Sequence, residues 1–319
     1  MKTTNVAGVD RAWAIAAGRA LYEKVGDYSV TGLLKPVRQV ELIKRHDAEI
    51  TFDVLDQLDI MLGNAMHMLL ADNEEKNVIK EQRFSIMVDV DGRNLELSLK
   101  PDYLRGEYNQ AMGTFWHIKD FKTIGAAQAV LALDKGKAEW DIQLNVYRWA
   151  LEKTGLFAKF GAMTIEAFVR DWSAMDAQIK ADRGYPQSRV FTVQIEKRDN
   201  AWVENFVVTR IREFEKYKAV KTDEELPLCT PEERWERPSE WVVSKKGSNG
   251  RALPRSRCQT EAVAKQFQMA RKDPNDCECV FRPGRNVRCE RYCLAGKAGV
   301  CQQWNAMKAQ LPKDTEDEG

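Results

Sequence analysis

The sequence lacks the features that mark membrane, secreted and repetitive proteins. Its 319 residues contain no run of about 18 apolar residues, the length that a membrane-spanning helix needs. Among the first twenty residues, the charged residues Lys2, Asp10 and Arg11 lie between small ones, so we expect no continuous apolar signal segment. We find neither an internal repeat nor a low-complexity tract. We therefore expect a globular cytoplasmic protein with no membrane partner.

The chain also lacks an overall charge excess. Its 49 Lys and Arg residues balance 48 Asp and Glu residues, so global charge indicates no polyanionic partner. The local distribution is uneven, because residues 242–291 contain twelve Lys or Arg against five Asp or Glu, whereas residues 313–319 are acidic. The basic stretch is either a surface that follows a phosphate backbone or a set of solvated arginine-rich loops.

Cysteine is absent before Cys229, although the chain has seven, and five of them lie between Cys277 and Cys301. In a reducing compartment this clustering favours metal or cluster ligation over disulfides. Four thiolates suit either a structural Zn²⁺ or a [4Fe–4S] cluster, and unligated buried thiols are the alternative. The candidate ligands are Cys229, Cys289, Cys293 and Cys301, with Cys277 or Cys279 as a substitute for a distant Cys229.

Hydrophobic periodicity predicts an α/β fold with a mixed central sheet flanked by helices. Helices are expected over residues 11–24, 53–70, 139–152, 200–220 and 260–271. Strands are expected over residues 81–90, 95–103, 115–123, 160–170, 189–197 and 241–244, with a hairpin turn at Asp91-Gly92. A composition break at residues 226–231 predicts a core over 1–225, which includes a helical lead-in, and a small basic Cys-rich module over 226–319.

The helix expected over residues 53–70 carries an apolar stripe that predicts one buried face. Gly63 and His67 lie four residues apart on the other face, between further apolar residues, which predicts a helix packed on both sides. Because Gly in a helix interior costs about 1 kcal/mol relative to Ala, we expect a neighbouring element to approach closely at Gly63. Considered alone, His67 is more typical of a satisfied core histidine than of a metal ligand.

The strand expected over residues 115–123 contains the main candidate catalytic residues. Alternation along a strand points Asp120 and Lys122 to the same side, so a carboxylate that can hold a divalent cation lies beside an ammonium that can orient water or phosphate. Asp102 follows Pro101, which ends the preceding strand, and Gln143 and Tyr147 share a helix face. Glu81 is a further carboxylate, but a solvated residue at the start of a strand is the favoured interpretation.

In order and spacing, Gly63-x-x-x-His67, Asp102, Asp120-x-Lys122 and Gln143-x-x-x-Tyr147 resemble the RecB-like branch of the PD-(D/E)xK nuclease superfamily. This branch includes CRISPR-associated nucleases and many phage exonucleases, and the resemblance covers roughly residues 50–155. It departs from the family pattern in Leu99, where Gly is common, and in Phe121, where Tyr is frequent.

This resemblance implies a restriction-endonuclease-like core and a residue-by-residue assignment of the site. His67, Asp102, Asp120 and the backbone carbonyl of Phe121 would bind one or two Mg²⁺ or Mn²⁺ ions. Lys122 would position or deprotonate the attacking water, while Gln143 and Tyr147 would steady Lys122 and the DNA phosphate. Several members also attach their C-terminus to the core through a [4Fe–4S] cluster on four cysteines.

The sequence therefore predicts a metal-dependent deoxyribonuclease, an exonuclease that acts on linear duplex or single-stranded DNA ends in phage recombination or replication. Its setting would be the cytoplasm of a phage-infected bacterial host, with a single-strand annealing recombinase as a further partner. Its C-terminal module would present Arg282, Arg285, Arg288 and Arg291 to DNA. The alternatives are a catalytically silent DNA-end-binding or scaffold protein, and a small-molecule metallohydrolase. The sequence indicates neither cleavage polarity nor oligomeric state.

Overall fold

The computed structural model describes residues 1–19, 25–111 and 113–310, and its contacts divide into two units. The first unit comprises Met1–Lys35 and Thr51–Ala219, and the second comprises Pro36–Ile50 and the chain from Val220 onward. The expected boundary at 225/226 lies six residues after this division, and residues 36–50 were not expected in the second unit. Residues 20–24 of the first expected helix and the acidic residues 313–319 lie outside the described residues.

The first unit is built on a mixed sheet of five described strands in the order β10-β9-β8-β7-β4. Only β8 and β9 are parallel, and the other neighbours are antiparallel. The strands are β4 (Val78–Lys80), β7 (Tyr103–Asn109), β8 (Gly113–Ile124), β9 (Phe160–Val169) and β10 (Val190–Ile195). The expected α/β class with a mixed sheet is confirmed.

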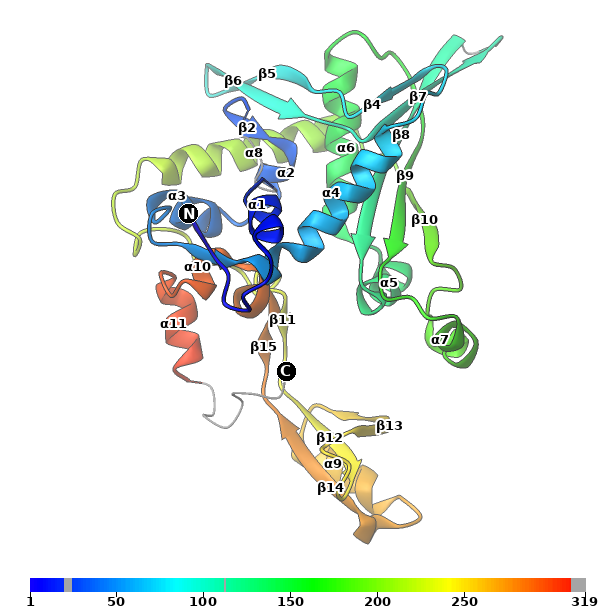
Figure 1. Ribbon diagram of the computed structural model, residues 1–319, viewed down its shortest axis with the longest axis vertical. Coiled ribbons are helices and arrows are strands. Elements are labelled where there is room, and N and C mark those ends of the chain that lie inside the picture. Colours follow the sequence, from blue (N-terminus) through cyan, green and yellow to red (C-terminus); the bar gives the residue numbers. More distant parts are fainter. Residues whose placement is uncertain (20–24, 112, 311–319) are drawn as a thin grey trace. The chain divides into compact units, whose positions relative to one another are not determined.

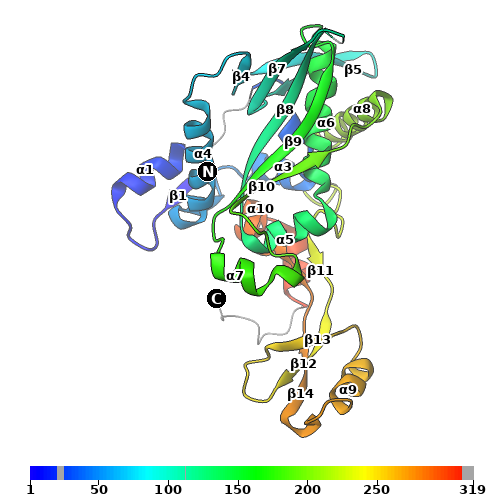
Figure 2. The same cartoon turned by 90° about the vertical axis from the view of Figure 1, so that its right-hand side faces the viewer.

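Two helices cover opposite faces of this sheet. Helix α4 (Leu58–Ala71) lies on one side and α6 (Ala138–Lys153) on the other, as the two views in Figures 1 and 2 show. Strand alternation explains the division, because Asp120 of β8 is bonded to α6 through Gln143, whereas the next residue, Phe121, lines a cavity with side chains of α4. Helix α5 (Ala126–Lys135) follows β8, and α8 (Asn200–Lys218) starts at Asp199, whose carboxylate accepts from two backbone amides.

A second sheet of the first unit contains β2 (Tyr28–Ser29), β6 (Arg93–Leu99) and β5 (Phe84–Val90), in that order. The hairpin between β5 and β6 turns at Asp91 and Gly92, whose φ angles are 56° and 79°. Two positive φ angles are the requirement of a type I′ turn, so the expected hairpin is confirmed. Leu95, Leu97 and Leu99 are buried on one face of β6.

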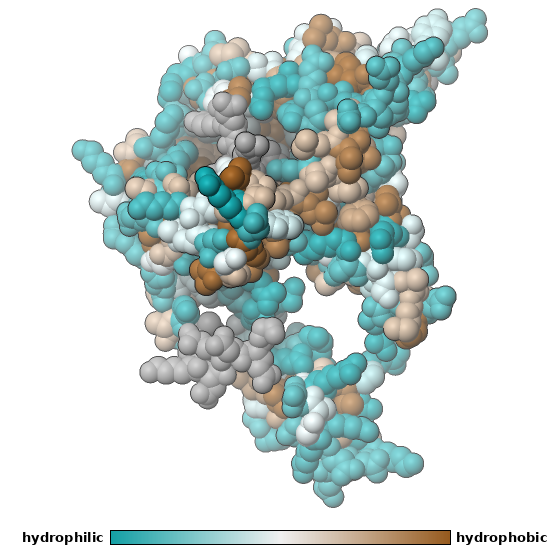
Figure 3. Space-filling model, in the orientation of Figure 1, coloured by the Kyte–Doolittle hydropathy of each residue, from teal (hydrophilic) through white to brown (hydrophobic). Residues whose placement is uncertain are grey.

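Helix α4 differs from its prediction. A 3₁₀ turn, η1 (Val54–Gln57), precedes it, and no residue of α4 is fully buried. Met68 and Leu69 are 72% and 69% exposed, and Figure 3 shows hydrophobic atoms gathered over this helix. A Cβ at Gly63 would meet nothing within 4 Å, so the expected close approach is wrong. Apolar periodicity predicts which residues share a helix face, but it does not predict whether another element covers that face.

Two other local expectations are corrected. The strand expected over residues 95–103 ends at Leu99, and a separate strand, β7, runs to Asn109 and forms a long hairpin with β8. Helix α5 was not expected at all. The remaining elements of the first unit are β1 (Lys2–Thr4) paired in parallel with β3 (Thr51–Asp53), α1 (Arg11–Arg19), α2 (Val30–Leu33), α7 (Ala174–Ile179) and η2 (Ala181–Arg183).

The second unit contains a small sheet in the order β13-β12-β14, packed against α9. Val243, Cys258, Ala264 and Cys277 form its core. Its elements are α3 (Val37–Arg45), β11 (Glu236–Arg237), β12 (Glu240–Lys245), β13 (Ala252–Cys258), α9 (Glu261–Met269), η3 (Pro274–Asp276), β14 (Cys277–Arg282), β15 (Arg285–Asn286), η4 (Arg288–Tyr292), α10 (Leu294–Lys297) and α11 (Gln302–Lys308).

Helix α3 joins the second unit through polar contacts with the residues that follow α8. Asp223 pairs with Arg45 at 3.1 Å and with Nε2 of His46 at 2.6 Å, and Arg38 donates to the backbone carbonyl of Leu226. These contacts join residues about 180 positions apart, which explains why the sequence did not indicate them. Among the described helices, none has both the length and the apolar character needed to cross a membrane.

Candidate active site

Strand register places three carboxylates side by side. Tyr103 pairs with Lys119 across β7 and β8 and with Lys80 across β7 and β4. Continued by one residue, the same ladders set Asp102 opposite Asp120 and Glu81 opposite Asp102. The amide of Glu81 donates to the carbonyl of Asp102 at 3.2 Å, which extends the ladder to that point. The acids therefore form one row across three neighbouring strands.

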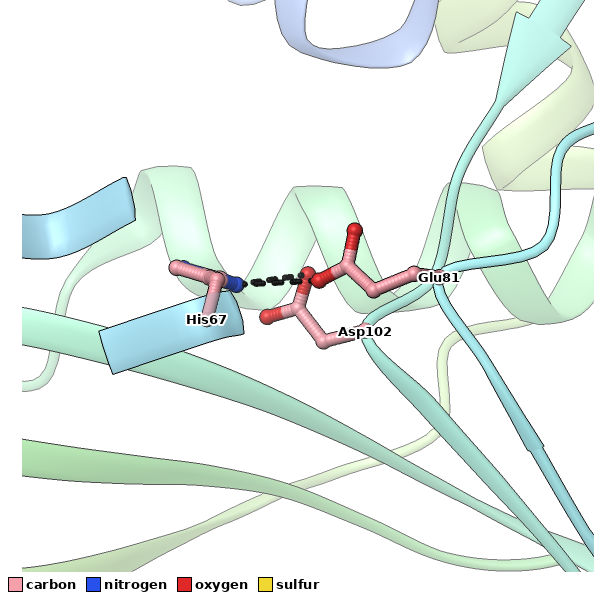
Figure 4. Close-up of side chains that lie close together, drawn as sticks. All are labelled: His67, Glu81 and Asp102. Carbon is pink, nitrogen blue, oxygen red and sulfur yellow. Dashed lines mark hydrogen bonds and ion pairs between the residues drawn. The ribbon is translucent and has the colours of Figure 1, made fainter. Parts of the chain in front are cut away.

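Helix α4 adds His67 to this row. Nδ1 of His67 lies 3.2 Å from Oε1 of Glu81 and 3.5 Å from Oδ1 of Asp102, and Figure 4 shows the three side chains pointing toward one another. Their ligand atoms all lie within 4.8 Å of one another, and no other trio of His, Cys, Asp or Glu in the described part of the chain meets that condition. His67 is thus a member of a potential metal site rather than an isolated core histidine.

Glu81 is the residue that sequence reasoning missed. It was expected as a solvated strand-start residue, yet its carboxylate contacts His67 and the Lys100 ammonium. Its φ angle is 51°, a conformation that non-glycine residues rarely adopt and that costs free energy. The tertiary structure holds this conformation and so directs the carboxylate to the site. No local sequence signal distinguishes Glu81 from an ordinary surface Glu.

Asp120 connects the carboxylate row to α6. It is only 1% exposed, and its Oδ1 accepts a hydrogen bond from Nε2 of Gln143 at 2.9 Å. Its Oδ2 lies 2.6 Å from Nζ of Lys122, although no donor in the described structure is aligned for a hydrogen bond to that oxygen. The predicted same-side placement of Asp120 and Lys122 is therefore observed, and Asp120 retains capacity to bind a cation.

Gln143 and Tyr147 complete the network. Lys122 donates to Oε1 of Gln143 at 3.1 Å, and Nε2 of Gln143 also lies 3.1 Å from the hydroxyl of Tyr147. Both residues are buried on the face of α6 that packs on the sheet. Gln143 thus fixes the carboxylate and the ammonium at once. The structure brings together all the side chains that the sequence nominated for this site.

Phe121 contributes its backbone. Its amide donates to Oδ2 of Asp102 at 2.7 Å, which fixes the peptide after Asp120 against the neighbouring carboxylate. The predicted ligand role of the Phe121 carbonyl stays a prediction.

The charge states of the site reflect this crowding. Burial, followed by repulsion from Asp120, raises the pKa of Asp102 to about 7. The hydrogen bond with Glu81 and the charges of Asp102 and Asp120 raise the pKa of His67 against the effect of burial. Burial opposes ionisation of Glu81, but hydrogen bonds from His67 and Lys100 outweigh it and lower the pKa of Glu81.

These groups fit a hard divalent cation. Carboxylate oxygens with one imidazole suit Mg²⁺ or Mn²⁺, whereas thiolates, which favour softer ions, are absent from this cluster. A divalent positive charge would offset both effects that raise the pKa of Asp102, the burial of its carboxylate and the repulsion from Asp120. Beside the cluster, α4 and the sheet enclose a largely apolar cavity of about 90 Å³, which His67, Phe121 and Lys122 help to line.

Four of the cysteines lie together in the second unit. Cys289 belongs to η4, Cys293 and Cys301 precede α10 and α11, and Cys229 is held by two hydrogen bonds with Gln303. Cys229 interacts electrostatically with the other three thiols, so residues more than sixty positions apart share one cluster. Burial raises the pKa of Cys229 and of Cys289 to about 12, with repulsion from Glu233 at Cys229 and from the neighbouring cysteines at both adding to it, so these groups are thiols unless a metal binds them.

The four sulfurs fit two kinds of group. A tetrahedral Zn²⁺ and a [4Fe–4S] cluster both take four thiolates, so the donor set is the same for either group.

Other predicted features of the second unit have different surroundings. Cys258, Cys277 and Cys279 pack in or against the core under α9, so the suggested substitution of Cys229 by Cys277 or Cys279 is not needed. Of the predicted arginine surface, Arg282 pairs with Glu240 at 3.3 Å, Arg285 pairs with Glu290, and Arg288 lies over the Trp235 ring at 4.3 Å. These arginines already stabilise the second unit internally.

Comparison with known proteins gives little further information. No family model matches the chain, and no curated protein matches it. Among solved structures, the crystal structure of SSO0001 is similar with a TM-score of 0.41 and 16% identity, over 62% of this chain and 84% of that chain. A similarity at this level carries no argument about the site, so the function rests on the geometry above.

Proposed function

We propose that the protein is a metal-dependent deoxyribonuclease that hydrolyses phosphodiester bonds, in agreement with its resemblance to the RecB-like PD-(D/E)xK nucleases. The observation that carries this proposal is the row of Glu81, Asp102 and Asp120, flanked by His67 and by the Lys122 ammonium. Carboxylates and an imidazole that converge on one point beside a lysine suit attack on an anionic ester.

Hydrolysis of a phosphodiester requires an activated water and stabilisation of the charge that develops on the non-bridging and leaving oxygens. A divalent cation, when bound by His67, Asp102 and Asp120, supplies Lewis acidity and lowers the pKa of a bound water. Glu81 and the carbonyl of Phe121 are the further candidate ligands. Magnesium and manganese are the ions proposed.

The other residues of the site act around this centre. Lys122 places a positive charge beside the scissile phosphate and orients the water, because Asp120 and Gln143 fix its ammonium. Gln143 holds the side chains of Asp120 and Lys122 in fixed positions relative to each other, and the Tyr147 hydroxyl fixes the Gln143 amide. Asp102 must lose its proton before it can bind a cation, which links activity to pH near 7.

We infer further that the enzyme acts at ends of linear DNA in phage recombination or replication, with a recombinase partner and a cytoplasmic location. These finer statements follow from the resemblance alone. Incubation of linear and circular duplexes with Mg²⁺ or Mn²⁺ tests the first of them, because an exonuclease degrades the linear DNA and spares the closed circle.

The central experiment compares cleavage by wild type, Asp120→Ala and Lys122→Met. Both variants are expected to lose at least a hundredfold in rate while keeping their circular dichroism spectra, because each removes a charge from the site. Lys119→Met is the matched control, since Lys119 lies on the same strand but pairs with Glu166. DNA binding without cleavage under both metals, for the wild type, would favour the silent DNA-end-binding alternative.

For the thiol cluster we propose a [4Fe–4S] group held by Cys229, Cys289, Cys293 and Cys301, with a structural role in the second unit. The resemblance supports this choice, because several members of the family hold such a cluster on four cysteines, and a structural Zn²⁺ on the same thiolates is the alternative. Protein purified without oxygen is expected to be brown, to absorb at about 400 nm and to contain iron. Colourless protein with one equivalent of zinc would overturn the assignment.

A further inference from the structure

One face of the five-stranded sheet forms the floor of the cavity beside the proposed active site. In the parallel ladder of β8 and β9, Phe121 pairs with Glu166 and Thr123 pairs with Phe168. In the antiparallel ladder of β9 and β10, Phe168 pairs with Val190. Because residues paired across a ladder point to the same face, these five side chains form one patch across three strands, and all five line the cavity.

Helix α4 forms the opposite wall of the cavity. Met66 and Leu70 lie four residues apart on one face of this helix, and they line the cavity together with His67. The cavity is partly open to solvent, and most of its lining is apolar. Four of its apolar side chains are therefore left partly exposed by the fold: Met66, Leu70, Phe121 and Phe168. A ligand that enters from the open side finds apolar surface on the helix and on the sheet.

The size of the cavity and its polar groups indicate what kind of ligand it takes. An enclosed cavity of about 150 Å³ binds benzene. This open cavity of about 90 Å³ therefore holds the larger part of a single six-membered ring. Thr123 and Glu166 add a hydroxyl and a carboxylate to the lining, which bond the polar edge of a ring but not a hydrocarbon chain. These features together fit a planar heterocycle.

The position of the cavity indicates what the ring is attached to. His67 and Lys122 line the cavity, and the same two side chains contact the acids of the proposed catalytic site. A ligand whose ring occupies the cavity therefore has its next group beside the Lys122 ammonium, which attracts an anion. A nucleotide has this arrangement, because a single sugar joins its base to its phosphate.

We propose that the cavity binds the base of the terminal nucleotide of a DNA strand, next to the phosphodiester that is cleaved. This inference rests on the proposed function and identifies a substrate contact of the same site. A terminal base has a stacking neighbour on one side only, so it leaves the duplex at a lower cost in free energy than an internal base. The rings of Phe121 and Phe168 and the thioether of Met66 replace the stacking that the base loses.

The test compares the binding of two short duplexes that carry an internal fluorescein, in Ca²⁺ to limit cleavage. One duplex is intact, and the other has an abasic residue in place of each terminal nucleotide. A base that stacks on protein side chains contributes about fivefold to hundredfold to affinity, so the wild type is expected to bind the intact duplex at least about fivefold more tightly. Met66→Trp, which fills the cavity, should bind both duplexes with equal affinity.

Met68→Trp is the matched control and should keep the wild-type preference. Met68 lies on the same helix, but it is 72% exposed and does not line the cavity. Should Met66→Trp unfold, Val190→Phe is measured in its place. It fills the cavity from β10, at a position that is 48% exposed and so has room for a larger side chain.

The outcomes separate this inference from the proposed function. Equal affinity of the wild type for the two duplexes, or a preference that the cavity-filling variant retains, overturns the base site and leaves the nuclease proposal standing. A preference for the intact duplex without cleavage in Mg²⁺ or Mn²⁺ supports the base site and overturns the nuclease proposal. Failure to bind either duplex overturns both.

Discussion

At the scale of single residues, the charge of Asp102 decides what the site can do. Asp102 lies between Glu81 and Asp120, and its burial and the repulsion from Asp120 hold its pKa near 7. A carboxylate with this pKa changes its charge near neutral pH, so folding stability is coupled to pH, and the proposed metal binding would be coupled to it as well.

The metal-free protein is expected to lose stability as pH rises from about 4 to about 7. Asp102 has a pKa of about 7 when folded, against 3.8 for an ordinary aspartate, so the folded state binds the extra proton between those values. Stability falls with pH wherever the folded state binds more protons, and the total effect is on the order of a few kcal/mol. Urea unfolding at pH 5 and pH 7.5 measures it.

The raised pKa of His67 acts in the same direction, because its extra proton is also lost as pH rises. Asp102→Asn is the control, since its amide cannot titrate, and it should flatten the pH dependence. A wild-type protein that gains stability over this range would contradict the proposed charge state of Asp102.

Glu81→Gln is expected to weaken Mn²⁺ binding at least tenfold, because it removes one charged oxygen from the group around His67. Titration calorimetry measures the change. Glu75→Gln is the matched control. Glu75 precedes β4, the strand that Glu81 follows, but its carboxylate bonds Lys80 and Tyr103. Equal Mn²⁺ affinity in the two variants would remove Glu81 from the metal site.

At the scale of helices and strands, the local sequence pattern predicts where an element forms, whereas tertiary contacts determine what the element packs against. Strand β8 and helix α6 were predictable, because the aromatic and β-branched residues of β8 are typical of a strand, and Gln143 and Tyr147 recur at helical spacing. The exposure of α4 was not predictable, since it depends on whether a partner covers the helix. The role of Glu81 was not predictable either, because only the β4–β7 pairing brings it to Asp102.

Alanine substitutions at two glycines, one in β9 and one in α4, are expected to change the stability in opposite directions. At Gly161 of β9, a Cβ would lie 2.6 Å from Cε1 of His117, a side chain fixed by a hydrogen bond from the Ala162 amide. Gly161→Ala is therefore expected to destabilise by about 1–3 kcal/mol. Gly63→Ala has open space and should stabilise α4 by up to about 1 kcal/mol.

Thermal unfolding of the two glycine variants measures both effects. A shift of about 2–4 °C per kcal/mol is expected for a unit of this size, downward for Gly161→Ala and upward for Gly63→Ala. Destabilisation by Gly63→Ala would show that an element does approach α4 at that point.

At the scale of the whole molecule, each unit contains its own candidate binding site. The first unit carries the carboxylate row, and the second carries the four thiols and the ion pairs of α3. The small second unit has a limited core, so a bound cluster would supply much of its folding free energy.

Cys293→Ser is expected to abolish cluster binding and to make the second unit sensitive to protease, while Mn²⁺ binding by the first unit is retained. Iron analysis, limited proteolysis and calorimetry measure the three properties. Cys279→Ser is the control, because Cys279 packs against the core under α9 and lies outside the thiol cluster. Loss of iron in both variants would argue against the assignment of the four ligands.

The proposed hydrolysis depends most on a divalent cation at the point where His67 and the acidic row converge. Anomalous diffraction from crystals grown with Mn²⁺, recorded at the manganese edge, tests this directly. We expect a peak within bonding distance of His67, Asp102 and Asp120. Fully occupied manganese elsewhere in the molecule, with no peak among these three side chains, would contradict the account.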